Sequence, residues 1–229
     1  MVGFARNILA ESDRAAAYFS GDRPHGRLRI GIADDLALTR LPQILRDFRR
    51  DNPLVDLDLT VDQSGLLHQR LEGDKLDVFI GKRPSGEDRG RLVKRDHLVW
   101  VGTPATKVDL ARPLRLVVYP APSLSRTEIR RALHRARLPF RTACVCRGVN
   151  GLIAAVAAGV GISALAASLV PIQLTTLGPG YGLPELGTID LVLQANPRTE
   201  HRPAVRALIS TVLAGGSSSL MAYGKADPR

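Results

Sequence analysis

The chain has 229 residues, of which 45% are hydrophobic, 24% charged and only 4% aromatic, and its formal net charge is +10 at pH 7. This length allows one large domain or two small ones with a sizeable core, which Leu, Val, Ile and Ala must build because aromatic residues are few. No apolar run reaches the roughly 18 to 20 residues that cross a bilayer, and no secretory signal opens the chain. These features argue against a membrane protein and favour a cytoplasmic one.

The first half of the chain alternates predicted strands with predicted helices. Residues 2–18 place apolar side chains among charged ones at intervals of three to four, which indicates an amphipathic helix that needs a partner surface. Glycine and proline between residues 21 and 26 end this helix. The next elements are a strand at 28–32, a helix at 41–48, a strand at 55–61, a loop at 62–65, a helix at 66–71 and a strand at 77–80. Such alternation predicts a parallel sheet with right-handed crossovers.

The second half repeats this alternation. Its predicted elements are strands at 98–101 and 114–119, a helix at 125–137, a strand at 142–146, a helix at 149–158, a glycine turn at 159–161, a strand at 162–165, a last strand at 189–194 and a last helix at 203–213. Ser123 or Ser125 is expected to cap the start of the helix at 125–137, and Ser125 with Glu128 has the spacing of a capping box. Gly and Ser residues dominate from Gly215 onward, which predicts a disordered tail over 215–229.

Basic residues are spread along the chain and do not follow the pattern of a nucleic-acid-binding motif. Their densest group, residues 126–137, has no interleaved aromatic side chains and is typical of a solvated helix face. Neither a helix-turn-helix nor a zinc-finger pattern is found in this sequence. We therefore expect no direct contact between these residues and DNA.

The cysteines and histidines do not predict a catalytic or metal site. Cys144 and Cys146 fall on a predicted strand, and we expect their side chains to point to opposite faces, which suits neither a disulfide nor a zinc site. The five histidines have no near neighbours at metal-ligand spacing, and the sequence has neither a nucleophile elbow nor a phosphate-binding P-loop. The prediction is a protein that is not an enzyme and needs no metal or cofactor.

Two series of residues carry the pattern of a known family. The first series is Arg29-Ile30-Gly31-Ile32, Leu41-Pro42-Gln43-Ile44-Leu45, Asn52-Pro53 and Gly73-Asp74-Lys75-Leu76-Asp77-Val78, and the second is Val156-Ala157-Ala158-Gly159-Val160-Gly161-Ile162-Ser163-Ala164-Leu165. Together they resemble the effector-binding domain of LysR-type transcriptional regulators over about residues 27–213. Residues 1–22 are similar to the end of the linker helix that dimerises these regulators.

The resemblance implies an α/β fold of two Rossmann-like lobes joined by two crossover strands, as in type II periplasmic binding proteins. Lobe I is expected at 27–102 plus 194–213, and lobe II at 103–193. The resemblance also implies a homodimer, with a tetramer as the alternative for the full-length protein. The winged helix-turn-helix of the family is not found here, so we expect DNA binding only through an N-terminal domain outside this sequence.

Ligands of open parallel sheets bind beyond the carboxyl ends of the strands, where loops and helix N-termini meet. The residues at these places are Asp34, Asp35, Ser64, Gly65, Lys82, Arg83, Tyr119, Arg147 and Asn150. Helix N-termini at Ser64 and Asn150, with the guanidinium groups of Arg83 and Arg147, favour an anionic effector. Asp34 and Asp35 suit an amine or a hydroxyl instead.

Each of these residues also has a purely structural interpretation. Ser64 and Asn150 are typical helix caps, and the basic side chains are typical of solvated loops or ion pairs. Asp34 and Asp35 suit helix caps or contacts between the lobes, and Tyr119 suits packing.

The function predicted from the sequence is effector sensing for transcription regulation. A small molecule in the cleft is expected to change the angle between the lobes and thereby the geometry of the dimer. The alternative is a free-standing solute-binding protein of the same fold. The linker-like helix and the missing export signal favour the first interpretation.

Overall fold

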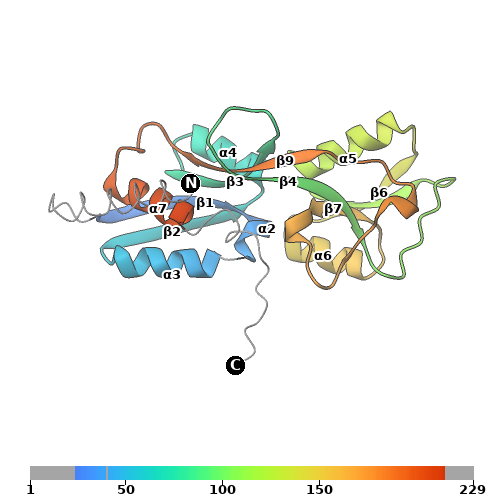
Figure 1. Cartoon of the computed structure of the whole chain (residues 1–229), viewed down its shortest axis with the longest axis horizontal. Helices are drawn as coiled ribbons and strands as arrows, with labels where there is room; N and C mark the ends of the chain where they lie inside the picture. The colour runs from blue at the N-terminus through green and yellow to red at the C-terminus, as the bar shows by residue number, and fades with distance from the viewer. Residues whose placement is uncertain (1–23, 40, 215–229) are drawn as a thin grey trace, which may run out of the picture.

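The computed structural model describes residues 24–39 and 41–214, which form two lobes side by side with two long strands running between them (Figure 1). The helix predicted at 2–18 and the tail predicted at 215–229 lie outside the described residues. Among the residues that are described, no helix is long and apolar enough to cross a membrane.

The first lobe is a three-stranded parallel sheet with helices on both faces. Its elements are β1 (Gly26–Ala33), α2 (Asp34–Ala37), α3 (Leu41–Asp51), β2 (Val55–Asp62), α4 (Ser64–Glu72), β3 (Val78–Pro84) and, from the end of the described chain, α7 (Pro203–Ala214). β1 pairs in parallel with both β2 and β3. Helices α3 and α7 pack together on one face of the sheet and α4 covers the other (Figure 1).

The helices of the first lobe form where apolar residues recur at helical spacing. Leu41, Ile44 and Phe48 of α3 are buried together against β1, because positions three and four apart lie on one side of a helix. On the other face, Gly31 of β1 lets α4 approach closely. A Cβ atom at this position would lie 2.5 Å from Cδ1 of Leu76 and 3.1 Å from Cδ2 of Leu67.

Two antiparallel strands carry the chain between the lobes. β9 (Thr188–Ala195) pairs with β3 on one side and with β4 (Arg91–Gly102) on the other, and the far end of β4 pairs with β7 (Ser163–Ala166). The resulting strand order is β2-β1-β3-β9-β4-β7, so a single sheet runs through both lobes.

The second lobe contains β5 (Leu114–Val118), α5 (Leu124–Arg135), β6 (Phe140–Val145), α6 (Val149–Ala157), β7, η1 (Ala167–Leu169), β8 (Thr175–Thr176) and η2 (Pro179–Tyr181). β5 and β6 are parallel, and Leu116 forms a parallel bridge to Ile162 next to β7. Gly161 is required there, because a Cβ atom would lie 2.4 Å from the carbonyl oxygen of Arg115. One cluster of buried side chains, including Ile30 and Trp100, is shared by both lobes.

The structure differs from the sequence prediction in several elements. β4 begins at Arg91 and β3 ends at Pro84, so both are longer than predicted, because their polar ends pair with β9 at the crossing. Residues 34–37, predicted as a loop, form the short helix α2. The predicted division into lobe I at 27–102 plus 194–213 and lobe II at 103–193 stays a prediction.

The cysteine pair also differs from the prediction. The Sγ atoms of Cys144 and Cys146 lie 3.6 Å apart, on the same side of the strand. The prediction of opposite faces was wrong, because residues two apart on a strand point the same way. Burial, with a further contribution from Cys144, raises the pKa of Cys146 to about 11, so this thiol stays protonated at neutral pH.

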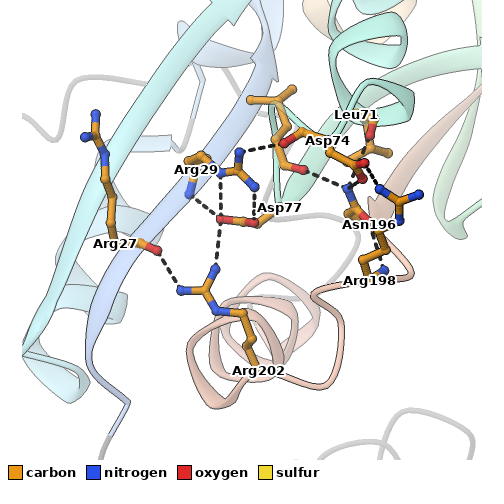
Figure 2. Close-up of polar contacts among 9 residues, drawn as sticks. Arg27, Arg29, Leu71, Asp74, Asp77, Asn196, Arg198 and Arg202 are labelled. Atoms are coloured by element: carbon orange, nitrogen blue, oxygen red, sulfur yellow. Dashed lines mark hydrogen bonds and ion pairs between the residues drawn. The ribbon is translucent and has the colours of Figure 1, made fainter.

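A buried carboxylate fastens α7 to the first lobe (Figure 2). Asp77, directly before β3, is fully buried and accepts hydrogen bonds from the backbone amide and the guanidinium group of Arg29, at 2.9 and 2.8 Å. Oδ2 of Asp77, which accepts the Arg29 amide, also lies 3.3 Å from Nη1 of Arg202, and Nη2 of Arg202 donates to the carbonyl oxygen of Arg27 at 2.8 Å. Burial alone would raise the pKa of Asp77, but the hydrogen bonds from Arg29 and the two positive charges outweigh it and hold this pKa below its ordinary value.

A second set of contacts beside Asp77 holds the turn that leads into α7 (Figure 2). The Nδ2 atom of Asn196 donates to Oδ1 of Asp74 at 2.9 Å and to the carbonyl oxygens of Leu71 and Leu76, both at 3.3 Å. Arg198 pairs with the same Asp74. The chain that returns from the second lobe is therefore bound to the amino-terminal end of β3.

We predict that Asp77→Asn lowers the free energy of unfolding by about 3 kcal/mol at neutral pH, because it leaves two guanidinium groups without their carboxylate. A carboxylate with a lowered pKa stabilises the fold above its unfolded pKa, so the difference from the parent chain should shrink as the pH falls below about 4. Urea unfolding followed by circular dichroism measures both effects. Asp58→Asn is the matched control, since Asp58 pairs with Arg27 at the surface and should cost less than about 1 kcal/mol.

Candidate functional site

A pocket of about 520 Å³ lies between the two lobes. The first lobe contributes the start of α4, the end of β3 and the loop that follows β3, and the second lobe contributes the loop before α5 and the first turns of α5. Two residues of the crossing strand β9, Val192 and Gln194, complete the lining. A volume of this size suits a small organic molecule.

Apolar side chains form part of the pocket wall. Phe79 of β3 and Val192 of β9 come from the buried side of the sheet, and Pro122 and Leu124 come from the second lobe. The two lobes meet at the pocket where Gly65 faces Pro122. A Cβ atom at Gly65 would lie 3.1 Å from the carbonyl oxygen of Pro122, so a larger side chain there would enter the pocket.

The charged residues of the pocket are mostly positive. Five cationic side chains line it, and Glu87 is the one acidic residue among them. The five are Lys82, Arg83, Arg89, Arg126 and Arg130. This excess of positive charge creates a local potential that attracts anions.

The end of β3 is held against the start of α4 by a side-chain hydrogen bond. The backbone amide of Lys82 donates to Oγ of Ser64 at 3.0 Å. Ser64 is the first residue of α4, and the cap of this helix is Gln63, not Ser64. Gly81 allows this approach, since a Cβ atom there would lie 2.4 Å from the ring of Phe79 and 2.9 Å from Oγ of Ser64. Lys82 and Arg83 are thereby placed at the pocket.

A second contact joins the lobes away from this pocket. Oδ2 of Asp34, in α2, accepts a hydrogen bond of 2.8 Å from the backbone amide of Val149, the first residue of α6. Figure 1 shows α2 and α6 on one side of the crossing strands and α4 and α5 on the other. Asp35 is buried beside Asp34 and pairs with Lys82.

The surroundings of the Asp34 carboxyl perturb its ionisation strongly. Burial, and then the negative charge of Asp35, raises the pKa of Asp34 to about 6. The charge of Lys82 and the hydrogen bonds from the amides of Val149 and Asp35 oppose this rise but do not cancel it. The contact between α2 and α6 therefore contains a group that titrates close to neutral pH.

The structure brings four of the predicted site residues to one place. Ser64, Gly65, Lys82 and Arg83 line the pocket, and Asp35 reaches it through its ion pair with Lys82.

The other predicted residues lie elsewhere. Tyr119 is buried in the second lobe among Val117 and Leu152, and its carbonyl oxygen accepts a hydrogen bond from Arg126. Arg147 and Asn150 are exposed and do not line the pocket, and the N-terminus of α6 beside them is occupied by Asp34.

Sequence reasoning missed the second-lobe wall of the pocket. Pro122 follows β5 in a loop of the same kind as the loops that were considered, so its position at a strand end was the available signal. Arg126 and Arg130 are one helical turn apart, but their segment was interpreted as a solvated helix face. Only the packing of α5 opposite α4 turns this face toward a ligand site.

No group of three or more His, Cys, Asp and Glu residues in the described part of the chain is arranged to hold a metal ion. The pocket offers cationic side chains and apolar surface to a ligand.

The chain matches the family described as "LysR substrate binding domain" over residues 21–217. It is 28% identical to the HTH-type transcriptional regulator DgdR of Burkholderia cepacia over 190 residues, which cover 83% of this chain and 65% of that protein. It is 27% identical to the HTH-type transcriptional regulator PecT of Dickeya dadantii over 220 residues, 96% of this chain and 69% of PecT. The match thus spans about two thirds of the length of these regulators.

Solved structures share the fold at low sequence identity. The regulatory domain of CcmR from Synechocystis, in complex with 2-PG, superposes with a TM-score of 0.68 at 18% identity, over 84% of this chain and 98% of that one. The effector-binding domain of QuiR, in complex with shikimate, gives a TM-score of 0.64 at 16% identity, over 85% and 98% of the two chains. The predicted fold of two lobes like those of periplasmic binding proteins is thereby confirmed.

We predict that Asp34→Asn stabilises the chain at about pH 7.5 by no more than roughly 3 kcal/mol. The folded state binds the Asp34 proton more tightly than the unfolded state, so ionisation costs stability as the pH rises from about 4 to about 6. The neutral amide avoids this cost and its oxygen still accepts from Val149, but its NH2 group replaces the oxygen that accepts from the amide of Asp35, which makes the gain smaller than this upper bound. Urea unfolding at several pH values should show the gain disappearing toward about pH 4.5. A gain that is equal at both ends of this range would contradict the assignment, and Asp56→Asn, on the exposed side of β2, serves as control.

Proposed function

The chain belongs to the family of LysR substrate-binding domains, and on this basis we propose that it is the effector-sensing domain of a transcriptional regulator that binds a small molecule in the pocket between α4 and α5. The observation that carries the proposal is that one pocket is lined by both lobes and by the strand that crosses between them. A ligand there contacts both lobes and the crossing strand β9.

The coupling that we propose follows from the position of the crossing strands. β4 and β9 are the two strand connections between the lobes in the described chain. Figure 1 shows α4 and α5, which contribute residues to the pocket, on one side of these strands and α2 and α6 on the other. A ligand that draws α4 and α5 together rotates the lobes about these strands. This rotation strains the hydrogen bond from the Val149 amide to Asp34 on the opposite side. The ligand shifts the equilibrium by as much as its affinities for the two lobe angles differ.

The partners that we propose are a second copy of the chain and, through residues outside 24–214, DNA. β2 is an edge strand of the sheet, and it exposes Leu59 and Val61 with fractional exposures of 39% and 47%. An edge strand with apolar side chains is a template for pairing with another copy. A change in the lobe angle would then reach DNA through the geometry of the dimer.

The class of effector is supported by the solved relatives. The CcmR regulatory domain is in complex with 2-PG and the QuiR domain with shikimate, both small organic molecules. The pocket of this chain has a volume typical of sites that bind small organic molecules.

We predict that a screen of small metabolites by thermal melting identifies at least one compound that raises the melting temperature of the chain. Binding to the folded state alone adds about 2.7 kcal/mol at a ligand concentration of one hundred times Kd, which corresponds to a shift of several degrees for a domain of this size. Gly65→Leu should abolish the shift, because its side chain enters the pocket against Pro122.

The matched control is Gly178→Leu, since a Cβ atom at Gly178 meets no atom within 4 Å and the residue does not line the pocket. A ligand that stabilises the parent and both variants equally would bind elsewhere, and the proposed site would then be wrong. A screen without any stabilising compound would count against the sensing function itself.

A further inference from the structure

Two arginines of α5 face the pocket without a negative partner. Within residues 24–39 and 41–214, neither Arg126 nor Arg130 forms an ion pair, although Nη1 of Arg126 donates to the carbonyl oxygen of Tyr119 at 3.2 Å. Glu128, the acidic residue of this helix, pairs with Arg131 at 3.0 Å instead. Two like charges four residues apart on a helix repel each other and destabilise it. An anion bound between them reduces this repulsion.

Arg83 has an unsatisfied donor in the same pocket. Its side chain is only 12% exposed, and its Nε atom is buried without a hydrogen-bond acceptor. Its Nη2 atom lies 3.7 Å from Asp190, because Arg95 already binds that carboxylate at 2.8 and 3.3 Å. A buried donor without an acceptor destabilises the folded chain, more so when the group is charged, so a ligand oxygen that supplies an acceptor to this guanidinium is favoured.

The other two cations of the pocket are already neutralised. Lys82 pairs with the buried Asp35, and Arg89 pairs with Glu72 at 3.1 Å and with Glu87 at 3.6 Å. The positive charge that remains available belongs to Arg126 and Arg130, with the unsatisfied Arg83 beside them. A ligand needs two negative charges to balance the two unpaired arginines.

We propose that the effector is a compact organic dianion, a dicarboxylate or a phosphate monoester, whose charged oxygens bind Arg126, Arg130 and Arg83 and whose carbon skeleton packs on Phe79, Pro122 and Val192. This inference rests on the proposed function and adds the chemical class of the ligand. Guanidinium groups bind carboxylate and phosphate oxygens through paired hydrogen bonds, which makes both sources suitable. Low water content near the apolar wall strengthens these charge interactions.

The test uses probes that share a skeleton and differ in charge. Phthalate, phthalamate and phthalamide carry two, one and no negative charges on the same ring, and phenyl phosphate carries its charges on a phosphate. Isothermal titration of the 229-residue chain should give affinities that fall at least tenfold between phthalate and phthalamide. A higher affinity for phthalate than for phenyl phosphate indicates a dicarboxylate effector, and the reverse order indicates a phosphate monoester.

The variant that tests the arginines is the double substitution Arg126→Gln with Arg130→Gln. We expect it to weaken the binding of phthalate at least tenfold while leaving phthalamide unchanged, because glutamine keeps the helix and removes only the charge. Arg135→Gln is the matched control, since Arg135 is exposed on the same helix and does not line the pocket. Equal melting temperatures of the three proteins establish that each is folded.

Each outcome decides between the two proposals. Equal affinities of the three phthaloyl probes, binding by none of the four probes at millimolar concentration, or an unchanged charge preference in the double variant would overturn the inference. A neutral or cationic ligand whose binding Gly65→Leu abolishes would overturn it too, while the sensing function stands. If no compound of any charge binds in a manner sensitive to Gly65→Leu, the proposed site fails as well.

Discussion

The antiparallel pairing of β4 with β9 is the constraint on which the arrangement of both lobes depends. β9 also pairs with β3 and β4 also pairs with β7, so the hydrogen-bond ladder is continuous from the edge strand β2 to β7. Such a ladder resists separation of the lobes, while the strands tolerate a change of twist. The pocket lies against β9, whose Val192 and Gln194 line it, and Asp190 of the same strand binds Arg95 of β4. A ligand in the pocket would therefore contact one of the two strands about which we propose that the lobes turn.

Buried carboxylates stabilise the arrangement of the strands and of α7. The cations of the pocket that have no carboxylate partner are the ones available to a ligand. Asp77 fastens the returning chain, Asp190 holds the crossing strands together, and Asp35 holds the end of β3. Hydrogen bonds from Arg95 in particular keep the pKa of Asp190 below its ordinary value. A buried acid with basic partners is costly to disturb, because loss of either partner leaves an uncompensated charge. The positive excess in the pocket is thus a local property and does not follow from the net charge of +10.

Much of the first lobe was predictable because each element buries a single face. The alternation of apolar and polar residues over β1 and the helical spacing of apolar residues over α3 predict which side chains enter the core. The first half of β4 was not predictable, since residues 91–97 are mostly polar and become a strand only through pairing with β9. α2 is too short for its periodicity to be seen. The return of α7 to the first lobe came from family resemblance. Its physical causes are burial of α7 side chains such as Val205 and Leu208 in the core and the contact between Arg202 and Asp77, which spans 125 positions of the chain.

The sequence by itself determined the fold class, the order of strands and helices, the family and one wall of the candidate site. Ser64 and Gly65 follow the end of β2, Lys82 and Arg83 lie at the end of β3, and the ends of parallel strands meet at one edge of a sheet whatever the rest of the chain does. Only the tertiary structure decided that α5 is the opposite wall, that Asp34 occupies the N-terminus of α6, and which cations stay unpaired. The physical reason is that these properties depend on which charges meet after the lobes have packed, and pairs such as Asp34 with Val149 are separated by 115 residues that local patterns cannot connect.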